Sequence, residues 1–160
     1  MGKVLRKFIN GYPGAVSRSV DNIIVSVRNA ADAAIPFGTP VFLVPGDRAC
    51  RLFEADVTSP ETFLGVAVRA ADKTPETYGS NQAAYEAGDP VDVLVRGSTV
   101  LMMESSAAPG SGVYIRKADG KVVASAGAEG TTVQLPGVTV RTARDSARCS
   151  EVVLTRRNIM

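Results

Sequence analysis

The stretch PVDVLVR, at Pro90–Arg96, has the pattern that decides the fold of this 160-residue chain. Val91, Val93 and Val95 alternate with side chains that include an aspartate and an arginine. Because successive side chains of a β-strand point to opposite faces, this alternation predicts a strand with one face in a core. Pro90 suits the first position of such a strand, since proline donates no backbone hydrogen bond.

Similar segments of four to seven residues recur along the chain, separated by turn residues. Asp119-Gly120 is a hairpin signal between two of them. Many short strands with frequent turns predict an all-β fold, a compact β-sandwich or β-barrel-like domain whose strand order stays open. The only helical signal is one or two turns over Gly79–Ala87. The further predicted strands are Ile23–Arg28, Pro40–Val44, Phe63–Arg69, Val100–Met103, Val113–Arg116, Lys121–Ala124, Gly137–Arg141 and Glu151–Thr155.

The first 22 residues lack this periodicity and contain the turn sequence Gly11-Tyr12-Pro13-Gly14. A residue before proline is pushed towards an extended conformation, so we interpret residues 1–22 as an extended N-terminal arm. Residues 23–160 then form a single β domain. Such an arm can add a strand to the edge of a neighbouring sheet.

The composition argues against an enzyme. The chain has no histidine, the side chain most used for acid–base catalysis near neutral pH and the commonest metal ligand. It contains neither a phosphate-binding loop motif nor a dinucleotide-binding motif, and we expect no cofactor and no metal. The acidic residues of one region are interpreted as solvated loop charges; these are Glu54, Asp56, Glu61 and Asp72.

The charge and the cysteines bear on the partners and the cellular compartment of the protein. Eighteen basic and sixteen acidic residues give a formal charge of +2, which neither predicts nor excludes a polyanionic partner. No secretory signal and no membrane-spanning segment are expected. Cys50 and Cys149 match no metal-ligand spacing, and we expect two reduced thiols, with a disulfide between them as the less favoured alternative.

Nucleic-acid binding is the main alternative of a different class, together with carbohydrate binding by a small β-barrel. Lys3, Arg6 and Lys7 lie near Phe8 and Tyr12, which is compatible with a basic arm on a barrel. However, stacking of bases needs aromatic rings on a strand surface, and the whole chain has only five Phe and four Tyr. We therefore expect no nucleic-acid partner.

Three segments resemble the phage capsid decoration or structural cement proteins, in matching order over most of the chain. The first is Gly11–Arg18 (GYPGAVSR), the second Ala84–Gly97 (AYEAGDPVDVLVRG) and the third Pro109–Ile115 (PGSGVYI). Another virion structural protein, such as a head fibre or a tail component, is the alternative within the same class.

The resemblance implies a structural protein of the virion, made in the host cytoplasm, that binds the exterior of the phage head. It implies that the major capsid protein is the partner, that the protein is a homotrimer, and that it stabilises the shell by bridging capsid subunits. It carries over no catalytic residue. The arm is then the expected capsid contact, through Lys3, Arg6, Lys7, Phe8, Tyr12 and Arg18.

Overall fold

The computed structural model describes residues 9–55, 57–70 and 83–155. Within them the chain forms eleven strands and one short 3-10 turn, η1 at Pro60–Thr62. The prediction of an all-β fold is confirmed. The strands are β1 Val16–Asn29, β2 Ile35–Pro36, β3 Pro40–Leu43, β4 Ala49–Arg51, β5 Phe63–Ala67, β6 Ala84–Tyr85, β7 Pro90–Met102, β8 Gly112–Arg116, β9 Val122–Val123, β10 Thr132–Val140 and β11 Cys149–Leu154.

Five of these strands close into a ring, in the order β1-β4-β3-β5-β7, because β7 also pairs with β1. The closing contact is a short parallel pairing of Arg28 with Ala49 and of Asn29 with Cys50. Alternate side chains of β7 fill the interior, where Val91, Val93 and Val95 join a buried cluster. The alternation that predicts the strand therefore describes the inside of a small β-barrel.

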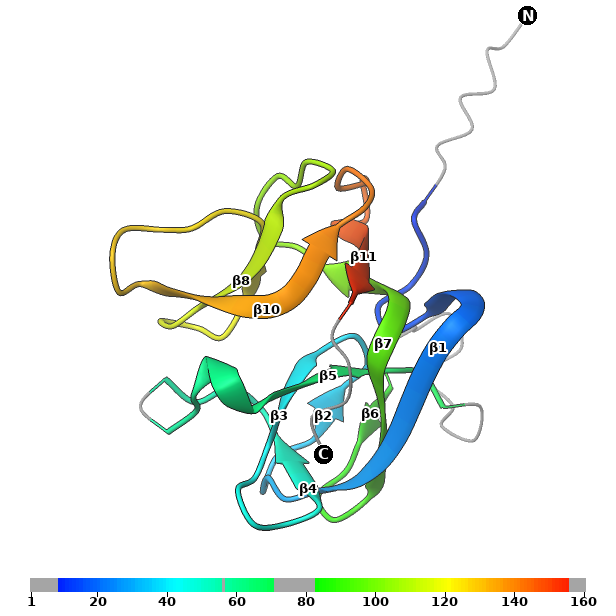
Figure 1. Cartoon of the computed structure of the whole chain (residues 1–160), viewed down its shortest axis with the longest axis vertical. Helices are drawn as coiled ribbons and strands as arrows, with labels where there is room; N and C mark the ends of the chain where they lie inside the picture. Colours follow the sequence, from blue (N-terminus) through cyan, green and yellow to red (C-terminus); the bar gives the residue numbers. More distant parts are fainter. Residues whose placement is uncertain (1–8, 56, 71–82, 156–160) are drawn as a thin grey trace, which may run out of the picture.

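The same nine-stranded sheet continues from the far half of β7 through β11, β10, β8 and β9, while β2 and β6 form a separate two-stranded sheet. The N–H of Glu104, just after β7, donates to the carbonyl of Val122 at 2.9 Å, so β9 returns to the end of β7. Phe42, Phe63 and Leu94, from strands of the barrel, pack in one cluster with side chains of this second half of the sheet. In Figure 1, β8, β10 and β11 lie at one end of the molecule and β2 to β6 at the other, with β7 joining them.

Gly97 lets the long strand β7 bend, so that its side chains contribute to both buried clusters. Its φ is +125°, and a Cβ there would lie 2.1 Å from Oδ1 of Asn22. Opposite it β1 bulges, because Arg18 pairs with Ser98 whereas Ile23 pairs with Arg96. Residues 19–22 thus face a single residue of β7, and both strands bend there. The segments Pro90–Arg96 and Val100–Met103, which the sequence predicts as two strands, are one.

Other boundaries differ from the prediction. β1 begins at Val16, not at Ile23, since Val16 pairs with Thr99 and Arg18 with Ser98. The short strands β2, β4 and β6 are absent from the sequence-based prediction. The predicted helical turn over Gly79–Ala87 is wrong where it can be compared, because Ala84–Tyr85 is strand β6, paired with β2; residues 79–82 lie outside the described residues.

The hairpin predicted at Asp119-Gly120 is confirmed. It joins β8 to β9, with Tyr114 opposite Val123, and Gly120 has a φ of +69°. Cys50 and Cys149 are both buried as free thiols. Burial raises the pKa of the Cys50 thiol to about 12.

Candidate functional site

The N-terminal segment is attached to the domain from Asn10 onward. The backbone N–H of Asn10 donates to Oδ2 of Asp145 at 2.7 Å. Its side-chain amide donates to the carbonyls of Ala143, at 2.9 Å, and Cys149, at 2.8 Å. A single residue, through its backbone N–H and its side chain, thus fixes the start of the described chain to the turn before β11. The division into an arm of residues 1–22 and a domain of residues 23–160 stays a prediction.

Two glycines bring this segment against the barrel wall. Gly14 donates its N–H to the carbonyl of Val100 at 2.9 Å and accepts from the N–H of Arg69 at 2.9 Å. With φ at +76°, a Cβ on Gly14 would lie 2.7 Å from the backbone nitrogen of Gly38. Only a residue without a side chain fits this close approach of two backbones.

Tyr12 is a predicted contact residue that the structure leaves 47% exposed. The guanidinium carbon of Arg69 lies 5.8 Å from the centre of its ring and 5.3 Å from the centre of the Phe37 ring. Cation–π contacts at exposed sites are worth about 0.5–1 kcal/mol each. Arg69 therefore joins Tyr12 to the barrel, while much of the tyrosine faces solvent.

Arg18, another predicted contact residue, is paired within the chain. Its Nε lies 3.1 Å from Oε1 of Glu151, and Oγ of Ser17 donates to the same oxygen at 2.7 Å. Glu151 on β11 is buried, so these two donors compensate its charge. The Arg18 side chain remains 57% exposed.

The other predicted contacts, Lys3, Arg6, Lys7 and Phe8, lie outside the described residues. The structure therefore brings only Tyr12 and Arg18 into one segment. A capsid contact by any of the six stays a prediction.

Exposed apolar side chains gather along the same segment. Of the eight large apolar side chains exposed in the described residues, six fall between Ile9 and Ile24. They are Ile9, Tyr12, Val16, Val20, Ile23 and Ile24. Within the described ranges no strand pairs with the second edge of β1 before Arg28, so this row borders an open strand edge.

The sequence-based prediction of a strand over Ile23–Arg28 missed most of this row. A signal was present in the adjacent pair Ile23-Ile24. Neighbouring residues of a strand point to opposite faces, so a strand with only one buried face must expose one of the two. The bulge then leaves both about half exposed.

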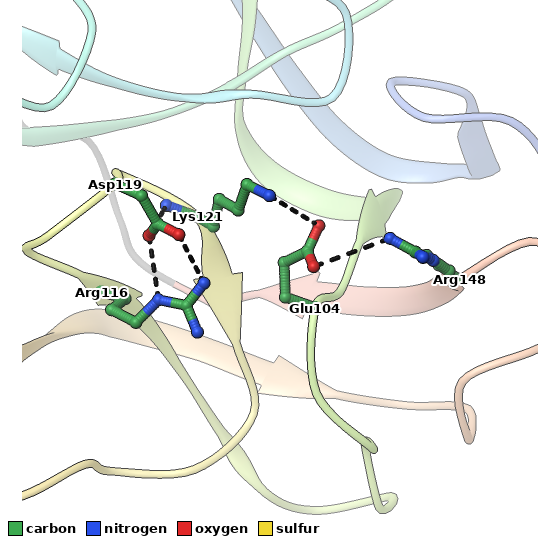
Figure 2. A network of polar contacts seen from close by, with 5 residues as sticks. All are labelled: Glu104, Arg116, Asp119, Lys121 and Arg148. Carbon is green, nitrogen blue, oxygen red and sulfur yellow. Dashed lines mark hydrogen bonds and ion pairs between the residues drawn. The ribbon is translucent and has the colours of Figure 1, made fainter.

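A polar network fixes the β8–β9 hairpin at the end of β7 (Figure 2). Glu104 lies between Nζ of Lys121, at 3.5 Å, and a terminal nitrogen of Arg148, at 3.7 Å. On the hairpin itself Arg116 holds Asp119 through two nitrogens, with Nε 3.0 Å from Oδ1. These hydrogen bonds lower the pKa of Asp119 to about 2. Arg148 belongs to the turn before β11 that also binds Asn10. The polar network and the N-terminal segment are therefore both attached to this turn.

Beside this network lies an open hollow of about 560 Å³. Its lining includes Pro13, Phe37 and Met102 from the segment and the barrel, and Lys121 from the hairpin. In the part of the chain that the structure describes, no group of three or more acidic or cysteine side chains is placed to hold a metal ion. None of the helices found in those residues has the length and apolar character needed to span a membrane.

These features define a class of protein: an all-β domain in which most of the large exposed apolar side chains of the described residues lie in one segment, Ile9–Ile24. Comparison with known proteins gives the family. Residues 3–156 match the family described as "Structural cement protein (E217 gp24/Pam3 gp6)". The chain belongs to this family of phage structural proteins, and the resemblance seen in the sequence is confirmed.

Solved structures agree with the fold. A chain from "The capsid of Myoviridae Phage XM1" is similar with a TM-score of 0.73 and 18% sequence identity, over 96% of this chain and 95% of that one. The head fibre gp8.5 N base of bacteriophage phi29 has a TM-score of 0.43 and 14% identity, over 86% of this chain and 99% of that one, a likeness too weak to carry an argument. No curated protein matches the sequence. The family membership makes this a phage structural protein that stabilises a capsid.

Proposed function

We propose that the protein binds the exterior of a phage head as a homotrimer and bridges neighbouring subunits of the major capsid protein. The observation that carries the proposal is the row of exposed apolar side chains along Ile9–Ile24, beside the open edge of β1. Large exposed apolar surface on a soluble domain marks a site of protein interaction. We further propose that the protein is made in the host cytoplasm, has no catalytic activity, and needs neither a membrane nor nucleic acid as a partner.

The contacts that fix the N-terminal segment to the domain explain how this surface can hold a shell together. Asn10, Gly14 and Glu151 fix the segment to the barrel and to β11. A contact surface that is rigid before binding loses little conformational entropy on binding. Each copy then needs only modest affinity, because a trimer that spans several subunits raises the effective concentration of every contact.

The predicted contacts Lys3, Arg6, Lys7 and Phe8 would extend this surface before Ile9, and Tyr12 and Arg18 lie within it. Their test must spare the fold. Deletion up to Arg18 would remove the hydrogen bonds of Asn10 and the first pairs of β1. A loss of head binding by that variant would then not distinguish a lost contact from a lost fold. Removal of residues 1–8 leaves those contacts in place.

The test is co-sedimentation of the purified protein with phage heads that lack it. Wild type should pellet with the heads and raise the temperature at which they release DNA. A double variant, Ile23→Ser with Ile24→Ser, should lose most of this binding, whereas Val57→Ser, at another exposed apolar position, should keep it. Equal binding by both variants would contradict the assignment of the surface.

Light scattering tests the homotrimer separately. The proposal expects a mass three times the 16.7 kDa of one chain, either in solution or after release from heads. A monomer in both conditions would refute the trimer and leave the capsid-binding proposal to the sedimentation result.

A further inference from the structure

The bulge of β1 exposes an apolar side chain to an unusual degree. Val20 is 86% exposed, the most of the large apolar side chains in the described residues. It is held there by geometry, because residues 19–22 have only Gly97 opposite them. Asp21, next to it, has a φ of +70°, and both Nε and a terminal nitrogen of Arg96 hold its carboxylate, at 2.8 and 2.7 Å. Val20 is therefore presented on a fixed turn.

Three arginines line a hollow beside this turn. A hollow of about 190 Å³ separates the bulge from the end of β11, and Arg18, Arg96 and Arg141 line it together with Val20. Arg18 pairs with Glu151, and Arg96 pairs with Asp21. Arg141 has no ion pair among the residues that the structure describes. Among the described residues, Arg141 is therefore the arginine of this hollow without a carboxylate beside it.

We propose that this hollow, the bulge site, binds an acidic segment of a capsid subunit, with a carboxylate against Arg141 and an apolar side chain against Val20. The inference rests on the proposed function and names the chemistry of the partner. Charge complementarity carries it: arginine pairs readily with carboxylates, often through two parallel hydrogen bonds. Removing the exposed Val20 side chain from water adds a favourable apolar contribution to the same contact.

Two variants and two matched controls test the bulge site. Arg141→Glu and Val20→Asp change exposed side chains, and both proteins should melt at the wild-type temperature. Their controls are Arg48→Glu, at another exposed arginine in the turn between β3 and β4, and Val57→Asp. We expect Arg141→Glu and Val20→Asp to raise the dissociation constant for heads about tenfold or more, and the controls to leave it within about twofold. Salt should weaken the binding of wild type more than that of Arg141→Glu.

The outcomes separate the two proposals. If wild type binds heads and both bulge variants bind equally well, the bulge site is refuted while the proposed function stands. If wild type does not bind heads at all, the proposed function fails and the bulge site fails with it. Retention of wild type on single-stranded DNA, lost in Arg141→Glu, would identify a nucleic acid as the occupant and overturn the assignment.

A photoreactive amino acid placed at position 20 identifies the occupant directly. On assembled heads it should cross-link to the major capsid protein within a segment rich in Asp or Glu. Cross-links to a second copy of this chain, or to a capsid segment without acidic residues, would refute the proposal.

Discussion

Replacing Gly14 by alanine should loosen the attachment of the N-terminal segment to the barrel. At φ +76° a side chain costs about 1–2 kcal/mol. The added Cβ would also lie 2.7 Å from the nitrogen of Gly38 and 2.9 Å from the Cβ of Phe37, and overpacking of this kind costs about 1–3 kcal/mol. We expect the free energy of unfolding to fall by about 2–5 kcal/mol.

Gly46→Ala is the matched control. Gly46 has nearly the same φ, +80°, but nothing lies within 4 Å of a Cβ placed there. It should therefore lose only the conformational part, about 1–2 kcal/mol. The effect of alanine on the unfolded chain is common to both variants and cancels in their difference.

Urea denaturation followed by circular dichroism measures the two free energies of unfolding, and thermal melts measure the two melting temperatures. The melting temperature of Gly14→Ala should lie roughly 2–12 °C below that of Gly46→Ala, at about 2–4 °C per kcal/mol for a chain of this size. Equal destabilisation of the two variants would refute the reasoning, because the close approach of Gly14 to Gly38 would then contribute nothing.

Three further changes test the structure. Glu151→Ala should lower the free energy of unfolding by about 1–3 kcal/mol in urea denaturation, since it removes the buried acceptor of two donors, and a stability equal to wild type would contradict that role. Asp119 has a lowered pKa in the folded state, so its contribution to stability is complete above its ordinary pKa near 4 and is lost as the pH falls towards 2. Thermal melts over this pH range should therefore show a smaller loss of stability for Asp119→Asn than for wild type. Parallel curves for the two proteins would argue against the pair of Asp119 with Arg116. Cys50 and Cys149 should react with Ellman's reagent only after denaturation, because burial raises the pKa of both thiols, and rapid reaction of the native protein would contradict their burial.

The sequence predicts the strand β7 well, but it leaves open whether the strands close into a barrel. The valines of β7 alternate strictly, and such a pattern has one explanation, a strand with a buried face. Closure depends on β1 meeting β4 over two residue pairs, Arg28–Ala49 and Asn29–Cys50. A three-residue strand such as β4 has too few residues to show a period, so its pairing follows from tertiary structure alone.

The start of β1 illustrates a second limit. Residues 16–22 pair with β7 or bulge from it, and every one of their side chains that the structure describes is exposed or only partly buried. Hydrophobic alternation arises from burial, so a strand without a buried face gives no such signal. For the same reason the sequence predicts no exposed apolar row from Ile9 to Ile24, and of that row only Tyr12 is among the predicted contact residues.

The long strand β7 shows how a glycine can conceal continuity. Gly97 and Ser98 separate two apolar runs, and by sequence this is the mark of a turn. In the structure Gly97 has a positive φ but stays within the strand, opposite the bulge of β1. A glycine inside a strand pattern is therefore compatible with a bulge as well as with a turn, and only the partner strand decides between them.

The central claim is that the row of side chains from Ile9 to Ile24 holds this domain on the outside of a phage head. Electron cryo-microscopy of heads with and without the protein tests it most directly. The account predicts difference density on the outer surface, fitted by the β domain, with β1 and its bulge turned towards the shell and in contact with at least two capsid subunits. Density inside the shell, or an outer domain whose β1 edge points into solvent, would contradict it.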